Sequence, residues 1–323
     1  MSDAADVVMY WLRTRRAANL DRGLAAVIEH CRRAAAANRM ELRHVSVDDI
    51  VVATSPVGVS VTIAGVPADR ANTFFHTKLM TWPETEKDTW RFVSTADLLA
   101  AAGFHTTVPT SVNVATNDKL LTLVTYAMDD IPWVPSIRVS TRGFSRIDPA
   151  AMPVEFPAIV KPANWGGGYG IQKVSSYSEL EAVLQLAGGG EITMVVQPWL
   201  GEKVADNRVY CIDGVGVAAT TRVAAAGAIV GNLHQGGRLE VIDVPDELRA
   251  PAQRIARLVG LPYVCIDFLE ADGRYYLSEI EVDGGTSGNE QLGVQRFGAY
   301  RRGFDRARAR RQEEFGLDPL GLG

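Results

Sequence analysis

The sequence predicts a protein of mixed α/β and α+β class, with two or three domains in its 323 residues. Three observations support this class. Strand and helix patterns alternate from the start of the chain. The length exceeds what a single hydrophobic core usually occupies, while 47% hydrophobic content suffices for a large buried interior. Later in the chain, a strand-loop-strand around four glycines and a hairpin of strands at 263–270 and 275–282 add antiparallel pairs.

Composition excludes several classes of function. The formal net charge of −5 gives no electrostatic footprint for nucleic acid or an anionic membrane. The three cysteines lie far apart and lack the paired spacing of a zinc site or a disulfide framework. The N-terminal stretch is unlike a signal peptide, and no apolar run reaches membrane-spanning length. We therefore expect a cytoplasmic protein with no nucleic-acid and no membrane partner.

The first hundred residues have the alternating pattern of an α/β domain. Apolar periodicity and residue propensity predict a strand at 6–12, a helix at 20–39, strands at 41–47 and 48–54, and a helix at 88–103. The last of these helices ends at Gly103, and Pro109 follows at the distance typical beyond a helix end. A domain boundary near residue 112 follows from this ending.

Four glycines occupy five positions in "IVKPANWGGGYGIQKV", residues 159–174, directly after an apolar strand. In phosphate loops that lead into a helix, the glycines meet the helix directly. Here "IQKV" predicts a second strand, and a helix follows only where Ser178 and Glu181 have capping-box spacing. The glycines therefore lie at the tip of a flap. Such a tip can offer N–H groups to a triphosphate beside Lys161, although a plain turn would also explain the glycines.

A pair of acidic residues marks a second candidate site. Glu279 and Glu281 lie two apart on a predicted strand, so their side chains share one face. The turn "DGR" would form a hairpin that places Asp267 opposite Glu279 if Gly273 is at its centre. Carboxylate oxygens suit Mg²⁺. Because like charges side by side destabilise a sheet, we favour a cation site over a solvated acidic strand.

The order of these motifs resembles the ATP-grasp superfamily, in its glutathione-synthetase-like and RimK-like branch. The resemblance runs from about Asp118 to about Asn289. Its pieces are, in order, "NDKL", "VKP", the glycine flap, "VVQPWL", "DNRVYCIDG", Arg222 in "ATTRV", "GNLHQGG", Asp267 and "SEIE". It implies a Rossmann-like pre-ATP-grasp domain at 1–112, a central lobe with the glycine flap at 113–198, and a C-terminal lobe with the metal site at 199–323. ATP would lie between the two lobes.

The resemblance also implies a role for individual residues. The phosphates would contact Lys119 and Lys161 beneath a flap made of Gly166, Gly167, Gly168 and Gly170. The adenine would meet a hinge made of Gln197, Pro198, Trp199 and Leu200. A ribose contact would come from Glu202 or Asp206, each of which could also be a surface acid. The transferred phosphate and the acyl group would face Arg208 and Arg222, in a cavity also lined by Asn232 and His234. The metal ligands would be Asp267, Glu279 and Glu281.

The expected reaction follows from this resemblance. ATP and Mg²⁺, as two ions with Mn²⁺ able to substitute, would convert a carboxylate into an acyl phosphate that an amine attacks. We expect small-molecule or peptide substrates and leave open a homo-oligomer, as a dimer or tetramer. A peptide macrocyclase forming side-chain ester or amide links, a small-molecule kinase and a non-catalytic ATP-binding module remain alternatives.

Two departures from the family pattern stand out in the sequence. The second metal strand reads Glu279-Ile280-Glu281 where the family usually has Glu-x-Asn, which adds a negative charge. The following "VDGGTSGNE" lacks the usual Ser-Pro-Gly run, and Asp283 and Asn289 could take over its role. Substrate recognition would involve loops such as 80–90, whose two tryptophans could form a binding lip or part of the core.

Overall fold

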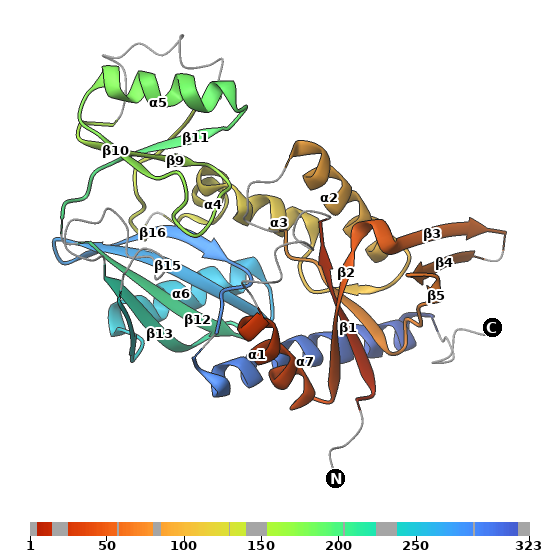
Figure 1. The fold of residues 1–323 in the computed structure, drawn as a ribbon. Helices are drawn as coiled ribbons and strands as arrows, with labels where there is room; N and C mark the ends of the chain where they lie inside the picture. The colour runs from red at the N-terminus through yellow and green to blue at the C-terminus, as the bar shows by residue number, and fades with distance from the viewer. Residues whose placement is uncertain are drawn as a thin grey trace.

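The computed structural model describes most of the chain (Figure 1). The described residues are 5–14, 25–56, 58–79, 85–128, 130–139, 154–202, 204–223, 238–286 and 288–315. They form a parallel sheet from the N-terminal part, a small antiparallel sheet from the middle of the sequence, and a larger antiparallel sheet from the C-terminal part. This arrangement confirms the predicted mixed α/β and α+β class.

The N-terminal sheet is parallel, with strand order β2-β1-β6-β7. Its strands are β1 (Val7–Arg13), β2 (Met40–Ser46), β6 (Thr73–His76) and β7 (His105–Thr106). One face packs on α1 (Ala25–Ala36) and α7 (Glu290–Phe315), and the other on α2 (Glu86–Ala101). A separate antiparallel sheet of β3 (Ile50–Ser55), β4 (Gly58–Ile63) and β5 (Val66–Pro67) packs on the same side as α2. The 3-10 turn Val47–Asp49 connects β2 to β3. Because parallel strands end at one edge, β1 and β6 deliver their last residues to the same side.

The middle sheet is antiparallel, with strand order β10-β9-β11-β8. Its elements are β8 (Ile137–Val139), β9 (Ala158–Pro162), β10 (Gln172–Val174), α5 (Tyr177–Gly189) and β11 (Met194–Pro198). The pairing of β9 with β10 confirms the strand-loop-strand around the glycines. The predicted capping box is wrong by two residues: Ser176 caps α5 by accepting from the N–H of Glu179, whose carboxylate accepts from the N–H of Ser175. The helix therefore begins earlier than Ser178.

The larger antiparallel sheet has strand order β14-β13-β12-β15-β16. Its strands are β12 (Ala205–Ile212), β13 (Val215–Val223), β14 (Arg238–Ile242), β15 (Tyr263–Ala271) and β16 (Arg274–Glu281). One face packs on α6 (Asp246–Val259) and on residues of α3 (Thr110–Asn117) and α4 (Lys119–Tyr126), forming one buried core. In Figure 1 the middle sheet and α5 lie above this sheet, and the parallel sheet lies beside it.

The hairpin of β15 and β16 differs from the prediction in its turn. Asp272 and Gly273 have φ of 49° and 72°, so the turn has two residues and is not centred on Gly273. An unbroken register from this turn would place Asp267 opposite Ser278. A bulge beside Asp267 shifts its partner to Glu279. The predicted pairing of Asp267 with Glu279 is thus confirmed, whereas the turn that was to produce it is wrong.

The described helices bear on two further expectations, which concern the tryptophans of segment 80–90 and membrane-spanning segments. Trp90 is 71% exposed on α2, so it is not part of the core, while Trp82 lies outside the described residues. Among the described helices, none combines the length and the apolar character that a membrane span requires.

Candidate active site

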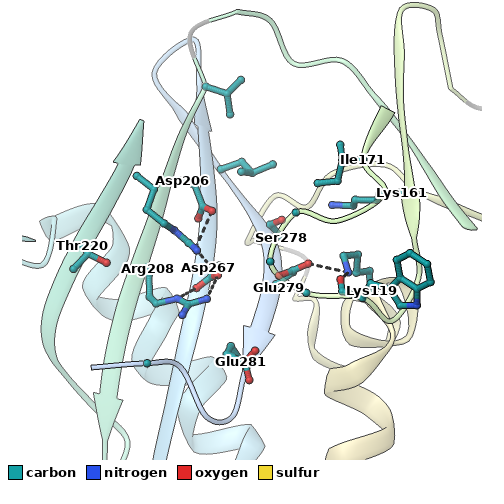
Figure 2. Close-up of a pocket in the computed structure, with 18 of the residues that line it drawn as sticks. Lys119, Lys161, Ile171, Asp206, Arg208, Thr220, Asp267, Ser278, Glu279 and Glu281 are labelled. Atoms are coloured by element: carbon teal, nitrogen blue, oxygen red, sulfur yellow. Dashed lines mark hydrogen bonds and ion pairs between the residues drawn. The ribbon is translucent and has the colours of Figure 1, made fainter. Parts of the chain in front are cut away.

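A cavity of about 630 Å³ opens between the middle sheet and the larger antiparallel sheet. One wall comes from the glycine loop, the end of β11 and the first residue of α4; the other comes from β12, β13, β15 and β16. This volume lies within the range of small-molecule and cofactor sites. Figure 2 shows lysines and carboxylates pointing into it from opposite walls.

Two buried lysines stand on one wall of the cavity. Lys119 begins α4, where its side chain donates to the Trp165 carbonyl at 2.5 Å and pairs with Glu279 at 3.2 Å. Lys161 is 7% exposed at the end of β9 and forms no ion pair within the described residues. Burial lowers the pKa of Lys161 to about 8, and the positive charge of Lys119 adds to the effect. An anion in the cavity would relieve both costs.

The glycine loop bends in a way that only glycine tolerates well. Gly167, Gly168 and Gly170 have φ of 67°, 74° and 73°, in the left-handed region. A Cβ on Gly170 would lie 2.8 Å from the Pro162 ring. Gly166, Gly167 and Gly168 line the cavity beside Lys161, whereas Gly170 is not among the described residues that line it. The loop therefore brings bare backbone close to a buried cation.

The segment predicted as a hinge, Gln197 to Leu200, also lines the cavity. The N–H of Trp199 donates to the Pro157 carbonyl at 3.0 Å, toward β9. Since backbone groups alternate sides along a strand, the carbonyl of Pro198, the last residue of β11, faces the opposite way. This carbonyl, one of the two polar groups that the prediction assigns to an adenine, is therefore on the side away from β9.

The two candidates for a ribose contact differ in position. Glu202 is not among the described residues that line the cavity, and it pairs with Lys173 at 3.1 Å. Asp206 lines the cavity and pairs with Arg222 at 2.8 Å. Burial raises the pKa of Asp206 to about 6 against the opposing effect of Arg222. The geometry thus favours Asp206 over Glu202 as a residue that a ligand can reach.

Two arginines and Asp267 form a compact group on the opposite wall. The register of β12 and β15 sets Arg208 directly opposite Asp267, and alternation turns both side chains to the cavity. Arg208 donates twice to Asp267, at 2.8 and 2.7 Å, and Arg222 donates to the same carboxylate at 2.9 Å. Burial alone would raise the pKa of Asp267, but the two arginines hold it below its usual value.

The three predicted metal ligands do not converge on one point. Asp267 binds two arginines, Glu279 pairs with Lys119, and Glu281 pairs with Lys78 at 2.8 Å, so each carboxylate is drawn to a different cation. In the described part of the chain, no group of three His, Cys, Asp or Glu side chains could hold a metal ion. Figure 2 shows Glu281 farther along β16, apart from the pair of Glu279 and Lys119. Their carboxylate oxygens still suit Mg²⁺ in chemistry, and their role as ligands stays a prediction.

Two predicted residues cannot be placed in the site, and the cysteines are not reactive. Asn232 and His234, in "GNLHQGG", lie outside the described residues. The three cysteines are buried and free. Burial raises the pKa of Cys211 to about 12 and that of Cys265 to about 11, so neither thiol is an activated nucleophile.

Sequence reasoning missed Lys78, which follows β6 and pairs with Glu281. Its signal was its place just beyond an apolar parallel strand, at the edge where such sheets hold their functional residues. Asp283 contacts Arg296 and lies 3.3 Å from His76. Asn289 lines the cavity and caps α7 by accepting from the Leu292 N–H at 2.9 Å. The role of both residues in place of the Ser-Pro-Gly run stays a prediction.

Comparison with known proteins identifies the family. Residues 116–296, more than half of the chain, match the RimK-like ATP-grasp domain family. The chain therefore belongs to this family, and the resemblance drawn from its motifs is confirmed. A probable alpha-L-glutamate ligase of Hydrogenovibrio crunogenus is 31% identical over 135 residues, and one of Alcanivorax borkumensis is 30% identical over the same length. The aligned stretch covers 42% of this chain but only 45% of either relative, about half of its length.

Solved structures share the fold over nearly the whole chain. The ATP-grasp ligase PsnB, complexed with a minimal precursor, has a TM-score of 0.62 at 18% identity, covering 94% of this chain and 99% of its own. D-alanyl-alanine synthetase A from Vibrio cholerae has a TM-score of 0.63 at 13% identity, with the same coverage. At these identities the likeness shows the fold alone.

The charge and the exposed backbone of one cavity wall fit a nucleoside triphosphate. Lys161 is a buried cation without an ion pair in the described residues, beside a second lysine and a loop of bare backbone. A triphosphate would supply the negative charge that this wall lacks.

Proposed function

We propose that this chain is an ATP-dependent, ADP-forming ligase that activates the carboxylate of an amino acid or peptide as an acyl phosphate and joins it to an amine. The observation that carries the proposal is the buried Lys161 at the foot of the glycine loop, which has no ion pair in the described residues and lies across the cavity from Arg208 and Asp267. The lysine on one wall would bind a phosphate, and the arginine on the other wall would stabilise negative charge that develops during the reaction.

Each wall would act on a different part of the reaction. Lys119 and Lys161 would hold the phosphates, with Gly166, Gly167, Gly168 and Gly170 closing over them, and Gln197 to Leu200 would hold the adenine. Bound Mg²⁺, as two ions for which Mn²⁺ can substitute, would neutralise the phosphate charge at Asp267, Glu279 and Glu281. Arg208 and Arg222 are already oriented by Asp267, so they can meet new negative charge without reorganising.

The chemistry needs no nucleophilic side chain. A carboxylate oxygen attacks the γ-phosphorus and ADP leaves; the amine nitrogen then attacks the acyl carbon, and phosphate leaves with the carboxylate oxygen. The names of the relatives, glutamate ligases and a ligase complexed with a precursor, support an amino acid or peptide as substrate. A cytoplasmic location and a dimer or tetramer belong to the same proposal.

Product analysis tests this function. The full chain is incubated with ATP, Mg²⁺ and a panel of free amino acids and glutamate-containing peptides, with hydroxylamine as a general amine. We expect ADP and phosphate in equal amounts, and a hydroxamate, only with a suitable carboxylate. ADP with a phosphorylated product and no free phosphate would instead indicate a kinase. Absence of ATP consumption across the panel would support a non-catalytic module.

A further inference from the structure

Lys78 is held in place by hydrogen bonds on both sides of its backbone. The side chain of Asn113, 2% exposed on α3, donates to the Thr77 carbonyl at 2.5 Å and accepts from the Leu79 N–H at 2.9 Å. The Thr77 hydroxyl donates to the Val108 carbonyl at 2.8 Å. The segment after β6 therefore has little freedom, and the base of the Lys78 side chain is fixed.

The head of the Lys78 side chain is equally constrained. The residue is 6% exposed, and its Nζ lies 2.8 Å from Oε1 of Glu281 at the end of β16. Although the Glu281 side chain is partly exposed, the pair keeps its geometry because separating the charges would leave the buried charge of Lys78 uncompensated. The N-terminal parallel sheet is thus tied to the strand that carries both Glu279 and Glu281.

The two carboxylates of β16 have partners of different kinds. Lys119, the partner of Glu279, lines the cavity, so an anionic ligand can draw it away. Lys78 is not among the described residues that line the cavity, whereas Glu281 is. A ligand can therefore reach Glu281 without displacing the lysine behind it.

We propose that Lys78 is a positioning residue of the nucleotide and metal site, which acts by holding the Glu281 carboxylate against the cavity wall. The inference rests on the proposed function. It also accounts for a carboxylate at position 281: with Lys78 behind it, Glu281 brings an oxygen ligand without adding net charge to the site.

The direction in which Lys78→Met changes the Mg²⁺ requirement separates a positioning role from a purely electrostatic one. Binding of a non-hydrolysable ATP analogue to the full chain is measured by calorimetry, and the Mg²⁺ concentration for half-maximal binding is determined. Removing a positive charge by itself would lower that concentration. Because Lys78→Met instead releases Glu281 from its position, we expect the concentration to rise about tenfold, within the range for coupled neighbours.

Further variants show whether Lys78 acts through Glu281. Glu281→Gln should raise the same concentration, and the double variant Lys78→Met/Glu281→Gln should match Glu281→Gln within about twofold, since nothing remains for Lys78 to hold. Lys78→Arg, which keeps the charge, should stay within about threefold of the parent. Arg32→Met, at an exposed arginine on α1 that does not line the cavity, is the matched control and should change nothing.

Several outcomes would overturn the inference. An unchanged or lowered Mg²⁺ requirement in Lys78→Met would do so, as would a double variant in which the two effects multiply. If Lys78→Met does not fold, the double variant is compared with Lys78→Arg, since the double variant leaves no unpaired charge. Equal Mg²⁺ requirements in these two variants would contradict the proposal. A parent chain that binds no nucleotide with Mg²⁺ would refute the proposed function itself, whereas a parent that binds normally confines any failure to Lys78.

Discussion

Lys161 carries a buried positive charge that costs stability in the folded chain. Its pKa is about 8 when folded and 10.5 ordinarily, so below pH 8 both the folded and unfolded chains hold the proton and the full cost is present. Between pH 8 and 10.5 only the unfolded chain keeps the proton, so stability rises with pH. The whole shift corresponds to about 3 kcal/mol at most.

Lys161→Met should therefore stabilise the chain while removing its function. We expect the free energy of unfolding at pH 7 to rise by up to about 3 kcal/mol, with the gain shrinking as pH approaches 10.5, and nucleotide binding to be lost. Urea unfolding at about pH 7 and about pH 9.5 with calorimetric binding checks both effects, and Lys87→Met serves as the exposed control. A variant that still turns over ATP normally would remove the basis of the nucleotide assignment.

Asp267 is the residue on which the opposite wall depends. Asp267→Asn leaves Arg208 and Arg222 without their shared carboxylate in a buried site, so we expect the free energy of unfolding to fall by roughly 3–5 kcal/mol. Asp272→Asn, at the exposed β15–β16 turn where φ is 49°, is the matched control, because Asn tolerates that backbone well. Equal stability of the two variants in urea would show that the arginines do not depend on Asp267.

At the level of single residues, the sequence indicated which side chains share a face of a strand, but not which residues they pair with. Alternation correctly placed Glu279 and Glu281 on one face, and both line the cavity, because a strand has period two whatever its surroundings. The partner of Glu281 could not be read in the same way. Lys78 lies far before it in the chain, and their contact exists only because the N-terminal sheet packs beside β16.

The glycine flap is the element whose motion the account requires. Its residues combine positive φ with few side chains, so we expect fast amide exchange at 165–172 without ligand and slower exchange with an ATP analogue and Mg²⁺. Hydrogen exchange followed by mass spectrometry measures this, with the β3–β4 hairpin as an internal reference. Unchanged exchange at 165–172 in a chain that binds the analogue would mean that the glycines serve only as a turn.

Elements were predictable where local chemistry decides them. The strand-loop-strand around the glycines and the hairpin of β15 and β16 both follow from apolar runs separated by turn residues. Fine placement was not predictable. Three serines, at 175, 176 and 178, compete for the start of α5, and the bulge beside Asp267 depends on the paired strand. Local pattern thus selected each element, while its exact register came from tertiary packing.

On the scale of the whole molecule, the site is assembled from three of the four sheets that the described residues form. The middle sheet supplies Lys161 and the glycine loop, the larger sheet supplies Arg208 and Asp267, and the segment after the parallel sheet supplies Lys78. The alternation of strand and helix patterns predicted the class of fold, and the order of motifs predicted the family. The domain boundaries near 112 and 198 stay predictions. No single motif in the sequence distinguishes one substrate from another, so the sequence left substrate choice open.

Isotope transfer is the most direct test of acyl phosphate formation. The full chain is incubated with ATP, Mg²⁺, hydroxylamine and a reactive carboxylate labelled with ¹⁸O on both oxygens, and the released phosphate is analysed by mass spectrometry. We expect each phosphate to carry one ¹⁸O atom from the carboxylate, and Lys161→Met to release no phosphate. Unlabelled phosphate accompanying hydroxamate formation, or release of AMP and pyrophosphate in place of ADP, would contradict acyl phosphate formation.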